Sequence, residues 1–183
     1  MESYLSSSIK QFQYYKSLGD RTFHQLSFEA LQKEISKDSN SIAIIVKHLS
    51  GNMLSRWTNF LTEDGEKEWR QRDLEFEDSY TTREALIAQW EKGWQCLFAA
   101  LTSLRSEDLE NIVFIRNQGH TVTEAINRQL AHYAYHVGQI VFLGKVLKGK
   151  DWSSLSIPKG HSKRYNEKKF NKEKERRHFT DDP

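Results

Sequence analysis

Helix breakers and covalent cross-links are both scarce in this chain of 183 residues. It holds two prolines, Pro158 and Pro183, and one cysteine, Cys96. Because proline is the strongest helix breaker, long helices are permitted everywhere before Pro158. A single cysteine excludes an internal disulfide framework, and the apolar setting WQCLFAAL favours core packing over a reactive thiol.

Strong net charge and long apolar runs are missing as well. The formal net charge is +2 at pH 7, which argues against a surface for nucleic acid or anionic membranes over the body of the protein. No apolar run approaches the roughly 20 residues of a membrane span. The N-terminal segment MESYLSSSIKQF lacks the basic and apolar regions of a secretory signal. We therefore expect a cytoplasmic globular protein that binds neither nucleic acid nor membranes.

Apolar residues recur at helical spacing in four segments and predict an all-α fold. The segments run from about Glu2 to Leu26, from near Ser39 or Asn40 to Phe60, from about Thr82 to Leu104, and from about Val122 to Leu147. Thr81 with Glu84, and Thr121 with Glu124, have the spacing of capping boxes at the starts of the third and fourth helices. Gly149 is placed to end the fourth.

Two connections between these helices are unusual. The stretch TEDGEKEWRQRDLEFEDSY, after the second helix, is too long for a simple turn, so we expect it to fold over one end of the helices. There its Trp69, Arg70 and Arg72 could cover a pocket or form part of a dimer surface. Before the fourth helix, NIVFIRNQGHTV alternates apolar and polar residues and could form a short β-hairpin.

The composition changes after Pro158, where a basic segment with few core-forming residues begins. We predict one domain over residues 1–158 and a mobile tail over residues 159–183. A solvated terminus is the favoured interpretation of the tail, and an arm that contacts polyanions is the alternative. In a third interpretation, Tyr165, Phe170 and Phe179 dock the tail onto the helices.

Three histidines form the most informative pattern. His132 and His136 are four residues apart in the fourth helix, so they lie on one face about 40° apart and could share a metal ion. His48 in the second helix lies about 120° to one side of the apolar stripe, and the other two flank their own stripe on the corresponding side. Three imidazoles would leave a coordination position open for water or substrate, as in catalytic metal sites.

Each of these residues also has a purely structural interpretation. A single histidine beside an apolar face is often a hydrogen-bonded residue at the core edge, and the pair lacks the glutamate of HExxH proteases. Asn52 and Arg56 follow His48 at one-turn intervals and could orient a substrate or serve as structural hydrogen-bond partners. The remaining histidines are expected to face solvent: His24, His120, His161 and His178.

The segments HLSGNMLSRWTNFL and LAHYAYHVGQIVFLGKVL together resemble the DinB-like (YfiT-like) superfamily of metalloenzymes, most closely a branch catalogued as a domain of unknown function. The matching residues are His48, His132, His136, Gly138 and Gln139, and DGEKEWRQRDLEF also resembles that branch. The resemblance covers about Met1 to Pro158. It implies a four-helix bundle of DinB-like type, a divalent metal held by the three histidines, and a homodimer.

The resemblance also implies a range of functions. Some members of the superfamily are metal-dependent thiol S-transferases or isomerases that use a low-molecular-weight thiol such as bacillithiol or mycothiol, and others are hydrolase-like. We therefore expect a metal-dependent transferase or hydrolase acting on a small-molecule substrate. The alternative is a noncatalytic metal-binding or stress-associated interaction module. Imidazole ligands are compatible with zinc, nickel, iron, cobalt and manganese, and no catalytic base is predicted.

Overall fold

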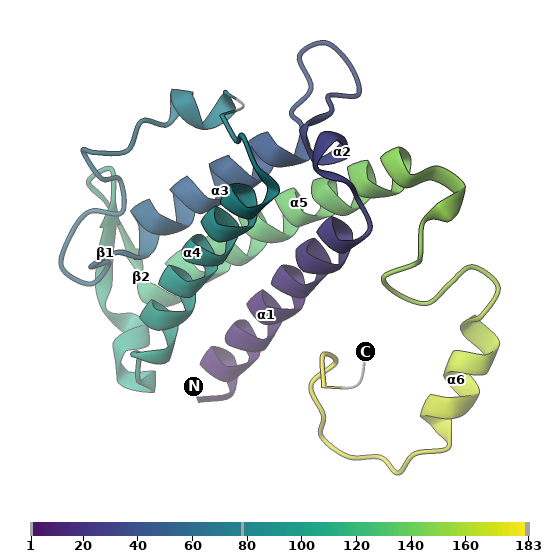
Figure 1. Cartoon of the computed structure of the whole chain (residues 1–183). Helices are drawn as coiled ribbons and strands as arrows, with labels where there is room; N and C mark the ends of the chain where they lie inside the picture. Colours follow the sequence, from purple (N-terminus) through teal and green to yellow (C-terminus); the bar gives the residue numbers. More distant parts are fainter. Residues whose placement is uncertain (1, 78, 182–183) are drawn as a thin grey trace.

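The structure of the protein is a computed structural model that describes residues 2–77 and 79–181. Met1, Asp78 of the predicted loop, and the last two residues of the predicted tail lie outside the described residues. The described chain is mostly helical, with one antiparallel sheet of two strands (Figure 1). The helices are α1 Glu2–His24, α2 Phe28–Gln32, α3 Ile42–Trp57, α4 Arg83–Thr102, α5 Val122–Lys148 and α6 Ser162–Phe170, and the strands are β1 Ile112–Ile115 and β2 Gln118–Thr121.

Helices occupy all the segments in which the sequence predicts them, but two of them begin later than expected. Helix α3 is capped by Ser41, whose hydroxyl accepts a hydrogen bond from the Ile44 amide at 3.2 Å, and not by Ser39 or Asn40. Helix α4 is capped by Thr82 in place of Thr81. The predicted capping box of α5 is confirmed, because Thr121 and Glu124 exchange hydrogen bonds between side chain and backbone.

The long helices pack around a common core. Helix α3 packs on α4 and on α5, and α1 packs on the same two helices from the other side (Figure 1). Gly93 of α4 permits a close approach to α3, since a Cβ atom there would lie 2.9 Å from the Cα atom of Ser50. Large side chains fill the centre; the fully buried aromatic ones include Phe12, Trp90, Trp94 and Tyr133.

The predicted β-hairpin is confirmed, and it anchors the long loop. Arg116 and Asn117 have positive φ angles of 55° and 60°, which suit a tight hairpin turn. The Asp64 carboxylate accepts hydrogen bonds from both of their amides at 2.8 Å, and the Gly65 amide donates to the Phe114 carbonyl at 2.8 Å. The loop then returns along α3 through a short 3₁₀-helix, η1 Asp73–Phe76. It therefore follows a defined path along α3, from Gly65 beside Ser55 back to Glu75 beside His48, and does not simply fold over one end of the helices as predicted.

The segment after Pro158 contains a helix that the sequence did not predict, α6, which lies apart from the long helices (Figure 1). Beyond it the chain returns to α1. There His178 contacts the Ser7 hydroxyl at 3.0 Å, and the Phe179 and Tyr14 rings lie 5.6 Å apart between centroids. Of the three aromatic residues considered for docking, Phe179 thus contacts α1, whereas Phe170 is 83% exposed.

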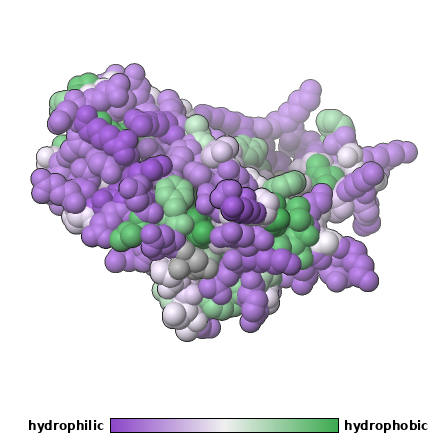
Figure 2. All heavy atoms as spheres, turned by 90° about the horizontal axis from the view of Figure 1, so that it is seen from above, coloured by the Kyte–Doolittle hydropathy of each residue, from purple (hydrophilic) through white to green (hydrophobic). Residues whose placement is uncertain are grey.

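Hydrophilic residues cover most of the face seen from above, with small hydrophobic patches between them (Figure 2). Among the described residues, no helix combines the length and apolar character needed to cross a membrane.

Candidate metal centre

His48, His132 and His136 come together between α3 and α5, as the helical phases predict. One ring nitrogen from each lies within 4.8 Å of the others, and no other such group of metal-binding side chains is found in the described chain. The Nε2 atoms of His48 and His132 are 3.4 Å apart. His48 is 5% exposed, so it lies deeper than the core edge expected from its phase, while the other two are half-buried.

Hydrogen bonds to the opposite ring nitrogens orient two of the imidazoles. Nδ1 of His48 is 2.9 Å from Oε2 of Glu75, and Nδ1 of His136 is 2.9 Å from Oε1 of Gln139. Both partner atoms are oxygens that accept, so each Nδ1 donates, and the neutral form of each ring then has its lone pair on Nε2. Such partners of the second ring nitrogen fix the tautomer and direction of metal-ligating histidines.

The donor set fits a divalent ion. Two nitrogens bound at about 2.0–2.1 Å in tetrahedral geometry are about 3.3 Å apart, which is close to the 3.4 Å between His48 and His132. Burial, together with the neighbouring His136 and His48, lowers the pKa of His132 to about 3, and burial also lowers the pKa of His136. Both imidazoles are therefore neutral at pH 7 and can donate nitrogen lone pairs.

Glu75, which hydrogen-bonds to His48 through the ring nitrogen opposite the one that faces His132, belongs to the long loop; we call such a residue behind a candidate ligand an outer partner. Its side chain is 8% exposed, and Arg70 binds both carboxylate oxygens at 2.8 and 2.9 Å. Burial acts to raise the pKa of Glu75, but hydrogen bonds from His48 and Arg70 outweigh it and lower the pKa. Gly51 makes room for this carboxylate on α3, because a Cβ atom there would lie 2.7 Å from Cδ of Glu75.

A cavity of about 340 Å³ adjoins the three histidines. Asn52 and Arg56 both line it, as their predicted role in substrate binding requires. Both also have structural partners. The Asn52 side-chain oxygen accepts a hydrogen bond from the Tyr133 hydroxyl at 3.0 Å, and Arg56 donates to the Gly65 carbonyl and to Glu66. The two interpretations of these residues are thus compatible.

The long loop contributes to the cavity wall. Arg70 and Arg72 line it, whereas Trp69 is 57% exposed and lies outside the lining. Sequence reasoning missed several other residues here. The family resemblance names Gln139, one turn after His136, without giving it a role, and Arg128 is new; Arg128 lies one turn before His132, so the helical repeat could have indicated it. The same repeat indicates Gln129, three residues before His132, whereas no local pattern indicates Glu75 or Arg116.

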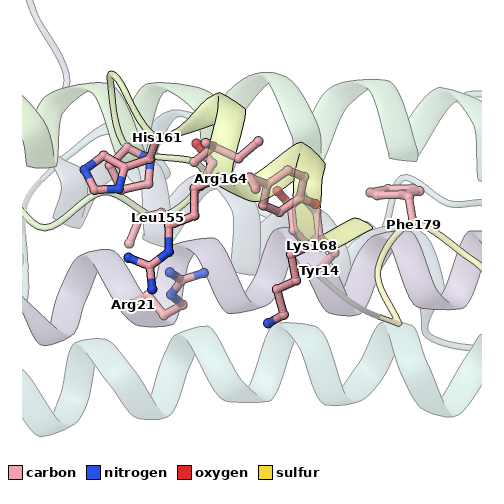
Figure 3. A pocket seen from close by; sticks show the side chains of 11 residues that line it. Tyr14, Arg21, Leu155, His161, Arg164, Lys168 and Phe179 are labelled. Carbon is pink, nitrogen blue, oxygen red and sulfur yellow. The ribbon is translucent and has the colours of Figure 1, made fainter. Parts of the chain in front are cut away.

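The other histidines lie outside the cluster. His24 and His161 are exposed as expected, but His120 and His178 are half-buried because His120 packs beside Arg128 and His178 beside Ser7. His161 lines a separate cavity of about 690 Å³, where Arg21 and Tyr14 of α1 face Arg164 and Lys168 of α6 (Figure 3). No residue of this cavity also lines the one beside the three histidines.

The sequence of this chain matches one known protein family. A sequence model of the family described as "Protein of unknown function (DUF1572)" matches residues 1–161, so the chain belongs to that family. Its match ends close to the predicted boundary at Pro158. Neither the curated proteins nor the solved structures contain a significant match.

Proposed function

We propose that this member of the DUF1572 family is a divalent-metal-dependent enzyme of the DinB-like superfamily, a thiol S-transferase or a hydrolase acting on a small molecule. The observation that carries the proposal is the convergence of three imidazoles beside a cavity, two of them oriented by hydrogen bonds to Glu75 and Gln139. Helices α1, α3, α4 and α5 would form the four-helix bundle of that superfamily. A homodimer in the cytoplasm is part of the same proposal.

The chain supplies the ligands and holds them in place. His48, His132 and His136 would each donate one ring nitrogen, and Glu75 and Gln139 keep protons on the opposite nitrogens of His48 and His136. When bound, a divalent ion would supply Lewis-acid chemistry that favours the thiolate of a thiol or lowers the pKa of water. Glu75 is fully engaged by His48 and Arg70, which makes it a positioning residue.

The cavity supplies the place for the reacting molecule. Its volume of about 340 Å³ lies within the range of small-ligand pockets. Asn52 is held by Tyr133, which itself accepts a hydrogen bond from the Trp57 indole at 3.1 Å. This fixed chain of hydrogen bonds positions the Asn52 amide at the cavity wall, where it can orient a substrate.

Elemental analysis of the purified protein tests the metal assignment. We expect about one divalent ion per chain after metal supplementation, with zinc, nickel, iron, cobalt and manganese compared in parallel. Replacing His48, His132 or His136 by alanine should weaken metal binding more than about tenfold, because losing a ligand should cost at least as much as losing a residue that hydrogen-bonds to a ligand. His24→Ala and His161→Ala are matched controls that should bind as the parent does. Equal binding in parent and His132→Ala would refute the assignment.

A screen against several small thiols, with and without an electrophilic or hydrolysable substrate, tests the catalytic part. Turnover that requires both metal and thiol supports a transferase, and turnover with metal alone supports a hydrolase. A noncatalytic metal-binding module is the competing function. It predicts that the protein binds metal but that spectroscopy of the cobalt-substituted protein detects no exchangeable water bound to the ion.

A further inference from the structure

The cavity beside the three histidines is unusually rich in arginine. No acidic residue among those described lines it. Its lining contains five arginines: Arg56, Arg70, Arg72, Arg116 and Arg128. They come from two parts of the sequence that are separated by α4: α3 with the loop after it, and the hairpin turn with α5. The fold thus gathers guanidinium groups around one small space.

Neighbouring carboxylates balance only part of this charge. Glu66 contacts Arg56, Arg70 and Arg116 at 2.9 to 3.3 Å, and Glu75 contacts Arg70. Asp64 lies nearby, but its oxygens accept backbone amides of the hairpin turn. In the described part of the chain, Arg72 and Arg128 form no ion pair; Arg72 lies over the Phe76 ring and Arg128 beside His120.

Arg56 adds an independent observation. It is 8% exposed, and its buried Nε atom has no hydrogen-bond partner among the described residues. A buried donor without an acceptor is costly, and an acceptor supplied by a ligand would recover that free energy. Guanidinium groups present planar pairs of donors that match the oxygens of carboxylates and phosphates.

We propose that this arginine-lined cavity is an oxyanion subsite that binds a carboxylate or phosphate group of the small molecule acted on at the histidine cluster. Arg72 and Arg128 supply the uncompensated charge, and Arg56 lies deeper in the wall. The role as a substrate subsite rests on the proposed function, whereas the binding of an anion does not. A neutral molecule of the same shape lacks the acceptor charge and is discriminated against.

Binding measurements on the metal-free protein test the subsite without catalysis. The probes are phenylphosphonate, benzoate and neutral benzamide, which share a phenyl ring and differ in the group presented to the arginines. Isothermal titration calorimetry should detect the two anions and show benzamide at least tenfold weaker. The tighter of the two anions identifies the group as phosphate-like or carboxylate. Raising the salt concentration should weaken both.

Arginine variants assign the binding to this cavity. Arg72→Gln and Arg128→Gln should each weaken the tighter anion about three- to tenfold and leave benzamide unchanged. Arg105→Gln is the matched control, since Arg105 has a side chain 75% exposed and lies outside this cavity. Equal anion affinity in the parent and in the Arg72→Gln/Arg128→Gln double variant would overturn the proposal, as would benzamide binding as tightly as benzoate.

Metal content measured on the same preparations separates the two proposals. Anion binding that depends on the arginines in a protein that takes up no metal would refute the proposed function and leave the subsite standing. A protein that loads metal through its histidines but distinguishes neither anion from benzamide would refute the subsite alone.

Discussion

At the residue scale, Glu75 is the side chain that fixes the orientation of His48 in the histidine cluster. A buried carboxylate is unfavourable unless it is paired and hydrogen-bonded. Both oxygens of Glu75 accept hydrogen bonds from Arg70, and Oε2 also accepts one from His48. The result is a carboxylate, histidine and open nitrogen in series, the arrangement by which proteins orient metal-ligating imidazoles. A buried histidine with a purely structural role also needs a partner for its ring N–H, so this bond supports a metal site only together with the convergence of the three rings.

Replacing Glu75 by glutamine tests this support. The neutral amide keeps the shape but weakens the acceptor of the His48 proton, so we expect metal affinity to fall about 10- to 100-fold. The matched control is Glu68→Gln, an exposed residue of the same loop. Competition with a chromophoric chelator measures both. Since Arg70 also loses a charged partner, thermal unfolding is recorded in parallel, and unchanged metal affinity in a folded Glu75→Gln protein would contradict the role of Glu75.

The lowered pKa of His132 predicts how the metal-free protein responds to acid. Its folded pKa is about 3, below the ordinary value of 6.5, so between these pH values the unfolded chain binds more protons than the folded one. The stability contribution of neutral His132 is therefore complete above pH 6.5 and is lost progressively as the pH falls toward 3. His136 acts in the same direction.

Urea unfolding of the chelator-treated protein at pH 7.5 and at pH 5.0 measures this dependence. The parent should lose more stability between the two pH values than His132→Gln, which has no imidazole to charge. His24→Gln, at an exposed position, should follow the parent. A parent and His132→Gln with parallel pH profiles would show that His132 titrates normally in the folded protein.

At the element scale, the sequence was most informative where the helical repeat alone places residues. The phases of α3 and α5 predicted that His48, His132 and His136 would share a crevice, and the hairpin followed from its alternating pattern. The positions of Glu75 and Arg116 could not be predicted, and Arg70 could be assigned only to an unspecified pocket or a dimer surface, because the path of the loop depends on Asp64, which binds the hairpin turn. The short helix α2 has too few residues for a periodic pattern.

Gly51 is the point where α3 lies closest to the Glu75 carboxylate of that loop, and its replacement gives a further test. Alanine there should favour the helix by about 1 kcal/mol, yet its methyl group would displace Glu75, whose Cδ lies 2.7 Å from the ideal Cβ position. We expect Gly51→Ala to bind metal several-fold more weakly while its helix content is unchanged. Gly138→Ala in α5 is the matched control, because no described atom beyond its chain neighbours and its own helix backbone lies within 4 Å of its Cβ position. Equal affinities in the two variants would mean that Glu75 can move without consequence.

At the scale of the whole molecule, the candidate centre and the C-terminal segment occupy different places. The cluster and its outer partners come from α3, the long loop and α5, and all of them precede the end of the family match at residue 161. The described contacts of the last residues are with α1, where Lys10 pairs with Asp181 at 2.6 Å and Phe179 meets Tyr14. These contacts are few and partly exposed, so each contributes little to stability.

A protein ending at Pro158 should therefore keep its metal and its helical core. The contacts with Ser7, Lys10 and Tyr14 are lost, which should lower the unfolding temperature by a few degrees, about the effect of 1 kcal/mol in a domain of this size. Metal content, circular dichroism and thermal unfolding of the full and shortened chains measure the three quantities. His161→Ala in the full chain separates loss of one imidazole from loss of the segment. If the shortened protein stays folded but loses its metal, the C-terminal segment holds a ligand or an outer partner, and the three-histidine assignment is incomplete.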